Sequence, residues 1–364
     1  MKKTLFIISL LLPFMAAAQN EPLAPADDSG KPHINIEFAG SGTADFTEGE
    51  FQKAYFKMNR VRLEILGDVN DKLSYHFRQA FNKSGIPASM DNITSSVEYA
   101  YLTWRPSDRF DLVAGKQCLT VAGYENWVNG LKVREFSDFN DNYPLFQAGV
   151  TGVMKFTPDQ HVLLQVANNR NEVSDTKLPL LATAAWNGWF ADRSLFLMYS
   201  ASAGQLAEGK NMYYLMCGNV YEKGPIFAYL DVLYARYGVD LQQRVSGLQS
   251  GSLPVVAQNT EYFTVIADFE YRFHPKWNGY IKGAYETAGV YEENGPYAAG
   301  NYMTSWNAQA CLEWFPFEEQ SGFKVFLHAI HRGYDLTDNA KALGAIKPST
   351  QRVSLGIQYI IPVM

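Results

Sequence analysis

Six basic side chains lie on runs where polar and apolar residues alternate, four near the start of the chain and two near its end. Arginine is always charged and holds a phosphate or a carboxylate with two hydrogen-bond donors, so a cluster of such side chains would attract anions. The basic residues that we select as candidates are Arg60, Arg62, His76, Arg78, Lys324 and Arg352.

Four acidic side chains alternate with apolar residues in a different part of the chain, between residues 260 and 315. If both sets face one aqueous space, opposed basic and acidic walls would create a transverse field that orients small dipolar or anionic solutes. A single position is more simply explained as a solvated residue paired with a neighbour, for example Arg62 with Glu64. The predicted acidic set is Asp268, Glu270, Glu286 and Glu313.

Residues for other kinds of chemistry lack the spacing that such chemistry needs. The six histidines do not have metal-ligand spacing with Cys or Glu, and the sequence contains no G-x-S-x-G, phosphate-loop or dinucleotide-binding motif. We therefore predict no enzymatic activity, no metal and no cofactor. A hydrolase within a barrel stays open as an alternative, with a Ser or Asp nucleophile beside a histidine on a neighbouring strand.

The composition and the first residues indicate an exported, ordered protein. Its 364 residues are 47% hydrophobic, 14% aromatic and only 19% charged, and a formal net charge of −6 does not favour a nucleic-acid partner. Residues 1–18 combine Lys2 and Lys3, an apolar run and three alanines, which is the order of a cleaved signal peptide. Residues 19–33 are predicted to be a mobile leader, and no later stretch could form a transmembrane helix.

From Ile34 onward the hydrophobic pattern repeats every two residues, which is typical of strands with one apolar and one polar face. The clearest runs are residues 60–65, 73–81, 263–273, 305–314 and 352–361. About sixteen such segments of about ten residues occur, and that length suits tilted strands that cross a bilayer. We therefore predict an all-β fold over residues 34–364, a transmembrane antiparallel β-barrel of about sixteen strands.

The predicted connectors alternate between short and long, as in barrels with short periplasmic turns and long extracellular loops. Aromatic residues such as Trp104, Phe156 and Trp314 lie beside the short turns, as a membrane-interface girdle requires. Short turns are predicted at residues 67–71, 106–109, 157–160, 187–188, 222–225, 274–276 and 316–321. Longer loops are predicted at residues 41–52, 82–96, 119–147, 170–177, 203–210, 238–259, 289–302 and 332–348.

An even number of strands lets the last strand pair with the first and leaves no unpaired edge in lipid. This closure would gather the basic set into one continuous stripe, with the acidic set on the opposite wall. A barrel of about sixteen strands is wide enough for a water-filled channel. A soluble secreted β-protein that binds carbohydrate or a partner would show the same alternation, but strand length and connector asymmetry favour the membrane barrel.

The longest connector, residues 119–147, is the third long loop and is too apolar to remain exposed to water, since it contains Trp127, Val133 and Phe139. We predict that it folds into the barrel and narrows the channel. Its charged residues include more acids than bases, which does not favour strict specificity for phosphate. The predicted constriction residues are Glu125, Lys132, Arg134 and Glu135.

Three short segments of this region resemble the phosphate-selective porins of the O and P type: Gly115-Lys116-Gln117, Gly123-Tyr124-Glu125 and Arg134-Glu135. The likeness also includes the signal peptide and the barrel pattern. The sequence differs at Val121-Ala122, where the family has Pro-Phe, and in its last residues, which are not aromatic. The resemblance implies a trimeric outer-membrane channel with an inward third loop and basic residues along the path of anions.

Together these features predict an outer-membrane porin of a Gram-negative bacterium that passes small hydrophilic solutes by diffusion. The expected solutes are anionic, with phosphate-type anions among them, or polar. The expected partners are outer-membrane lipid and two further copies of the chain in a homotrimer.

Overall fold

The computed structural model describes residues 32–85, 90–121, 123–128, 132–169, 176–249, 255–317 and 322–363. The predicted signal peptide, residues 1–18, and the first thirteen residues of the predicted leader, 19–31, lie outside the described residues. The last leader residue, His33, begins the first strand.

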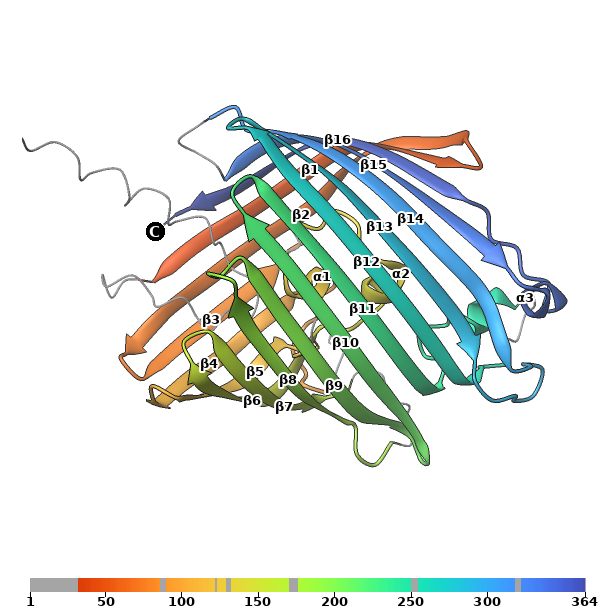
Figure 1. Ribbon diagram of the computed structural model, residues 1–364, viewed down its shortest axis with the longest axis horizontal. Helices are drawn as coiled ribbons and strands as arrows, with labels where there is room; N and C mark the ends of the chain where they lie inside the picture. The colour runs from red at the N-terminus through yellow and green to blue at the C-terminus, as the bar shows by residue number, and fades with distance from the viewer. Residues whose placement is uncertain are drawn as a thin grey trace, which may run out of the picture.

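Sixteen antiparallel strands form a closed barrel in which each strand pairs with its neighbours in the chain and β1 pairs with β16 (Figure 1). This confirms the predicted fold class, because closure gives every strand a partner on both sides. The strands are β1 (His33–Thr47), β2 (Glu50–Asn70), β3 (Leu73–Ala80), β4 (Val97–Ser107), β5 (Phe110–Cys118), β6 (Phe146–Thr157), β7 (Gln160–Asn168), β8 (Leu180–Phe190), β9 (Leu195–Ala207), β10 (Lys210–Lys223), β11 (Ile226–Val239), β12 (Gln258–His274), β13 (Trp277–Val290), β14 (Gly300–Trp314), β15 (Phe323–Leu336) and β16 (Thr350–Pro362).

The apolar face of the strands is turned outward. Leu102, Leu164 and Ile281 are 51%, 51% and 63% exposed, whereas the adjacent Thr103, Gln165 and Lys282 are buried inside the barrel. This arrangement is the opposite of a soluble β-protein, which packs its apolar face into its own core. The exposed side chains would therefore contact hydrocarbon, as expected for a membrane barrel.

Connector lengths agree with the prediction at one end of the barrel and only partly at the other. Five of the seven connectors that were predicted to be short join their strands through two residues, whereas two of the predicted long loops, 41–52 and 203–210, are wrong. There the strands continue and leave tight turns at Glu48-Gly49 and Glu208-Gly209. Glu48 and Gly49 both have positive φ, which suits a two-residue hairpin turn. In Figure 1 the β1–β2 hairpin extends beyond its neighbours.

The predicted turn at residues 187–188 is also wrong, because both residues lie within β8. The chain turns instead at residues 191–194, where three residues have positive φ. A Cβ on Gly188 would lie 2.4 Å from the side-chain oxygen of Gln160. That side chain accepts a hydrogen bond from the indole of Trp186 at 3.1 Å. Glycine at 188 leaves room for the Gln160 side chain, which crosses the backbone there, and does not mark a turn.

The described parts of the loops contain three short α-helices, α1 (Tyr124–Trp127), α2 (Asp138–Asp141) and α3 (Asp338–Ala342), and one 3-10 turn, η1 (Ser246–Leu248). Among the described residues, no helix has the length and apolar character needed to span a bilayer. In Figure 1, α1 and α2 lie inside the ring of strands.

Part of the barrel interior is apolar, because inward loops pack against β7–β14 there. Met212, Tyr214 and Met216 of β10 face this internal core, while Tyr213 and Leu215 between them are exposed on the outside. A strand that is apolar on both faces shows little alternation in sequence. The internal core therefore leaves the aqueous space to the opposite side of the barrel.

Candidate functional site

The described residues of the connector between β5 and β6, 119–121, 123–128 and 132–145, pack against the inner wall of the barrel. Asp231 of β11 accepts hydrogen bonds from the backbone N–H groups of Tyr124 and Glu125, both at 2.8 Å, at the start of α1. Helix N-termini carry unpaired N–H groups and partial positive charge, so a carboxylate there stabilises the helix. Gly123, with φ of 125°, precedes α1, and a Cβ at this position would collide with Met216.

Glu286 of β13 holds the second helix in the same way. Its carboxylate accepts hydrogen bonds from the N–H groups of Asp138 at 2.8 Å and Phe139 at 2.9 Å, and it pairs with Arg244 at 3.2 Å. Glu286 was predicted to line an acidic wall of the pore. Instead it is buried beneath the loop and serves as an attachment point for α2.

Glu125, a predicted constriction residue, is fully buried inside the loop. Its carboxylate accepts hydrogen bonds from the hydroxyl of Ser137 and the amide of Asn140, both at 2.6 Å, and forms an ion pair with Lys282 of β13. These bonds join the two helical turns of the loop to each other and to the wall. The carboxylate therefore maintains the loop fold and does not face the larger cavity described below.

Arg134 and Glu135 attach the loop to the last strands. Arg134 pairs with Glu313 of β14 at 2.6 Å and lies 3.5 Å from the ring centroid of Phe326. Glu135 pairs with Arg352 of β16 at 2.8 Å. Further ion pairs complete this contact region: Arg352 with Asp45 at 2.7 Å, Lys324 with Glu313 at 2.7 Å, Arg332 with Glu135 at 3.6 Å, and Arg332 with Asp138.

The remaining predicted acids, Asp268 and Glu270 of β12, line a small cavity of about 10 Å³ under the loop together with Lys132. Lys132 also lies 5.0 Å from the ring centroid of Phe227. The predicted open acidic wall is therefore wrong, because the loop covers the strands that carry it. The alternation of polar and apolar residues correctly placed these carboxylates inside the barrel. It could not show that the inward loop occupies the same part of the interior.

Four predicted basic residues lie together on β2 and β3, where three acids that were not in the predicted set pair with them. Arg62 forms ion pairs at 2.9 Å with both Glu37 of β1 and Glu98 of β4, not with the expected Glu64. The full set of further pairs is Arg78 with Glu98 at 2.9 Å and with Glu64 at 3.7 Å, and His76 with Glu64 at 2.9 Å. The alternation of polar and apolar residues in β1 and β4 is the signal that could have identified Glu37 and Glu98 as residues facing the barrel interior.

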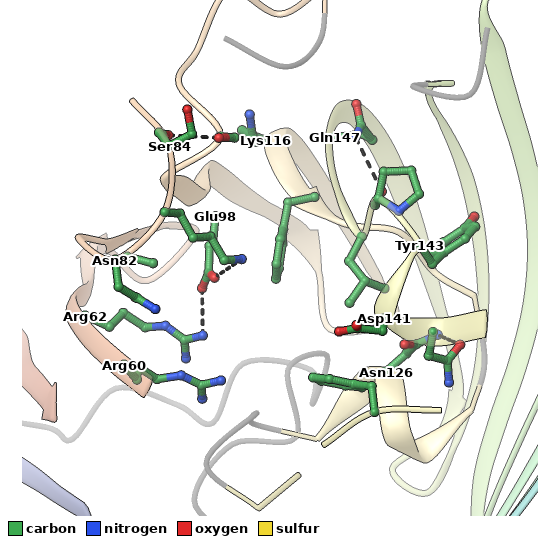
Figure 2. Close-up of a pocket in the computed structure, with 18 of the residues that line it drawn as sticks. Arg60, Arg62, Asn82, Ser84, Glu98, Lys116, Asn126, Asp141, Tyr143 and Gln147 are labelled. Atoms are coloured by element: carbon green, nitrogen blue, oxygen red, sulfur yellow. Dashed lines mark hydrogen bonds and ion pairs between the residues drawn. The ribbon is translucent and has the colours of Figure 1, made fainter. Parts of the chain in front are cut away.

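A cavity of about 470 Å³ separates this wall from the inward loop, and we call it the eyelet cavity. Its basic lining residues are Arg60, Arg62, Lys83 and Lys116, and its acidic ones are Glu98 and Asp141. Figure 2 shows Arg60 and Arg62 on one side of the cavity and Tyr143 and Asp141 on the other. Basic groups therefore outnumber acidic groups on this lining.

Lys83 and Lys116, which the sequence analysis did not select, belong to this basic lining. Lys83 pairs with Glu98 at 2.6 Å and keeps 43% of its side chain exposed, whereas Lys116 forms a buried pair with Asp91 at 2.9 Å. A second cavity of about 280 Å³ lies between Arg352, Arg332, Lys53, Asp45 and Glu135. The predicted basic residues thus fall into separate groups and do not form one continuous stripe.

A closed barrel with an apolar exterior, a charged interior and one long loop folded into it has the architecture of a porin channel. Three solved structures share the fold. The outer-membrane channel DcaP of Acinetobacter baumannii is 12% identical with a TM-score of 0.63, and the match covers 92% of this chain and 99% of that one. The trimer form of OmpT from Vibrio cholerae is 14% identical with a TM-score of 0.56, covering 92% and 100%. The anion-selective porin of Comamonas acidovorans is 7% identical with a TM-score of 0.58, covering 91% and 99%.

The sequence itself identifies the family. The model of the family described as phosphate-selective porin O and P matches residues 38–178 and 138–361, so the chain belongs to that family. No curated protein matches the chain. Family and fold together define an outer-membrane porin channel and point to a channel rather than an enzyme.

Proposed function

We propose that this porin passes small hydrophilic solutes by passive diffusion and favours anions. The observation that supports the proposal is the lining of the eyelet cavity, where four basic side chains face two carboxyl groups. A positive lining lowers the energy of an anion in a narrow aqueous path and raises that of a cation. Phosphate-type anions fit this charge, although the acids of the loop do not favour strict phosphate specificity.

Reversal potentials in planar bilayers under a KCl gradient test this proposal. Arg60 and Lys83 are suitable sites because both line the cavity and Lys83 keeps 43% of its side chain exposed beside Glu98. Arg62 and Lys116 form buried ion pairs that support the wall. The double variant Arg60→Gln/Lys83→Gln should lower the ratio of chloride to potassium permeability at least about twofold, since the lining loses its excess positive charge.

The matched control for this test is Lys177→Gln. Lys177 is exposed and pairs with Glu208 at the loop end of the barrel, so the same change of charge there should leave the ratio unaltered. A cation-preferring wild-type channel, or a double variant with wild-type selectivity, would contradict the proposal.

We further propose that the channel is a homotrimer. The support is the family resemblance in sequence, together with the solved trimer form of the similarly folded OmpT. Light scattering of the detergent-solubilised protein, with the detergent mass subtracted, gives the number of copies. A single copy in several mild detergents would contradict this assembly.

We also propose that residues 1–18 are removed on export, which leaves residues 19–32 as a leader before the barrel that begins at His33. The Lys-Lys, apolar and Ala-Ala-Ala order supports the cleavage position. N-terminal sequencing of the protein extracted from outer membranes should begin at Gln19. A different first residue would move or remove the predicted cleavage site.

A further inference from the structure

We infer that the eyelet cavity favours organic anions with an apolar body, such as aromatic monocarboxylates, over inorganic anions of the same charge. This inference rests on the proposed anion preference and specifies its substrate class. Three observations support it: the lining has a basic part and an apolar part, a cationic group lies close to an aromatic ring between them, and the cavity is large enough for an organic solute.

One part of the lining is suited to a carboxylate. Arg60, Arg62, Lys83 and Lys116 come from β2, β5 and the β3–β4 connector, and the side chain of Asn82 lies among them (Figure 2). Arginine and lysine bind carboxylates with charge-assisted hydrogen bonds, and amide groups add neutral donors. An anionic head group would therefore be held on this side.

The other part of the lining includes an apolar surface, and Asp141 and the amides of Asn126, Asn140 and Gln147 lie beside it. Val128 and Phe136 come from the inward loop, and Pro144, Leu145 and Phe146 come from its end and the start of β6. An inorganic anion would leave this surface in contact with water. A solute with an apolar body would cover the apolar surface and be stabilised by its removal from water.

Phe146 joins the two parts. Its ring centroid lies 5.2 Å from Nζ of Lys83 and 5.5 Å from the guanidinium carbon of Arg78. If a carboxylate bound to Lys83, the ring or short alkyl group attached to it would thus lie against Phe146. Phe146 also helps to hold the cations by cation–π interaction.

The size of the cavity agrees with such a solute. Its volume of about 470 Å³ is within the range of sites that bind small organic molecules, which is roughly 300 to 1,000 Å³. A filter for a small inorganic ion needs only a ring of close polar groups.

Permeability ratios measured under bi-ionic conditions, with benzoate, inorganic phosphate or chloride as probes, test the inference. For the wild type, the benzoate-to-chloride ratio should exceed the ratio of their mobilities in water at least about threefold, and the benzoate current should saturate. Phe146→Gln and Leu145→Gln should each remove this excess, because each variant replaces an apolar part of the lining by an amide. Phe51→Gln is the matched control, because Phe51 is exposed at the β1–β2 hairpin, away from the cavity.

The outcomes separate the two proposals. A benzoate ratio that only follows mobility, a preference for phosphate over benzoate, or an excess that survives both variants would overturn the inference and leave the anion preference intact. A cation-preferring channel in KCl would overturn the proposed function itself. Leu145→Gln provides a second readout if Phe146→Gln fails to fold, as judged by its mobility on unheated gels.

Discussion

Asp141 is the carboxyl group that the inward loop contributes to the lining of the eyelet cavity. Partial burial raises the pKa of Asp141, Arg332 lowers it, and the nearby Glu135 and Asp138 raise it further, with a net shift above the usual aspartate value. A carboxyl group with a raised pKa takes up its proton at higher pH than an ordinary aspartate. On acidification the cavity thus loses this negative charge while its arginines remain charged.

We predict that lowering the pH from about 7 to about 4 raises the chloride-to-potassium permeability ratio of the wild type. Asp141→Asn should already show a raised ratio at neutral pH and a smaller further increase on acidification, because its side chain has no charge to lose. Reversal potentials in KCl gradients at several pH values measure both effects. Asp338→Asn, at a fully exposed position on α3, is the control. Identical pH profiles for the wild type and Asp141→Asn would refute the role of Asp141.

At the scale of the elements, the loop between β5 and β6 depends on carboxylates that the wall supplies. Asp231 and Glu286 each accept two backbone N–H groups from a short helix, and Glu313 receives Arg134. Helices of one turn have little stability of their own, so these bonds fix the position of the loop. The narrow part of the channel is therefore set by strands on the far side of the barrel.

Asp231→Asn is predicted to weaken this attachment, because an amide offers one acceptor oxygen and brings its own N–H donors toward two backbone N–H groups. The loss should be about 1.5 to 3 kcal/mol for the loop alone, while the barrel stays folded. Hydrogen exchange of residues 123–128 should become faster, and single-channel currents should become noisier. Asp159→Asn, at an exposed turn between β6 and β7, should change neither quantity.

The sequence predicted the strands and the inward loop because both follow from local composition. Alternation identified the strand of residues 263–273, and the excess of apolar residues around Trp127 and Phe139 indicated a buried loop. It could not predict that Glu286 and Glu313 bind the loop, since that depends on which wall the loop reaches. Gly188 misled the prediction because a glycine that leaves room for a neighbouring side chain cannot be told from a glycine in a turn by sequence alone.

At the scale of the whole molecule, the apolar outer surface makes the barrel stable in a lipid bilayer. Leu164 lies near the middle of β7 and is 51% exposed on the outer face. We predict that Leu164→Arg lowers the free energy of unfolding from lipid bilayers by about 2 to 4 kcal/mol, because the charge would lie in hydrocarbon. Urea titration of the protein in phosphatidylcholine vesicles measures this loss.

Val255→Arg is the control for that measurement. Val255 is also half-exposed but lies in the connector between β11 and β12, outside the strands. The same substitution there should have little effect on folding into bilayers. Equal losses at both positions would mean that the outer face of β7 does not contact lipid.

The pairing of β1 with β16 brings Asn35 opposite Pro362, and the N–H of Val363 donates to the carbonyl of Ile34 at 2.8 Å. The two ends of the wall are therefore as close as any two sequential strands. A circularly permuted gene, with a short linker between residues 363 and 32 and new termini in the tight turn at residues 108–109, would encode the same ring. The order in which the strands are synthesised could thus be changed without changing the finished barrel. Such permuted chains would show whether assembly depends on which strand is made last.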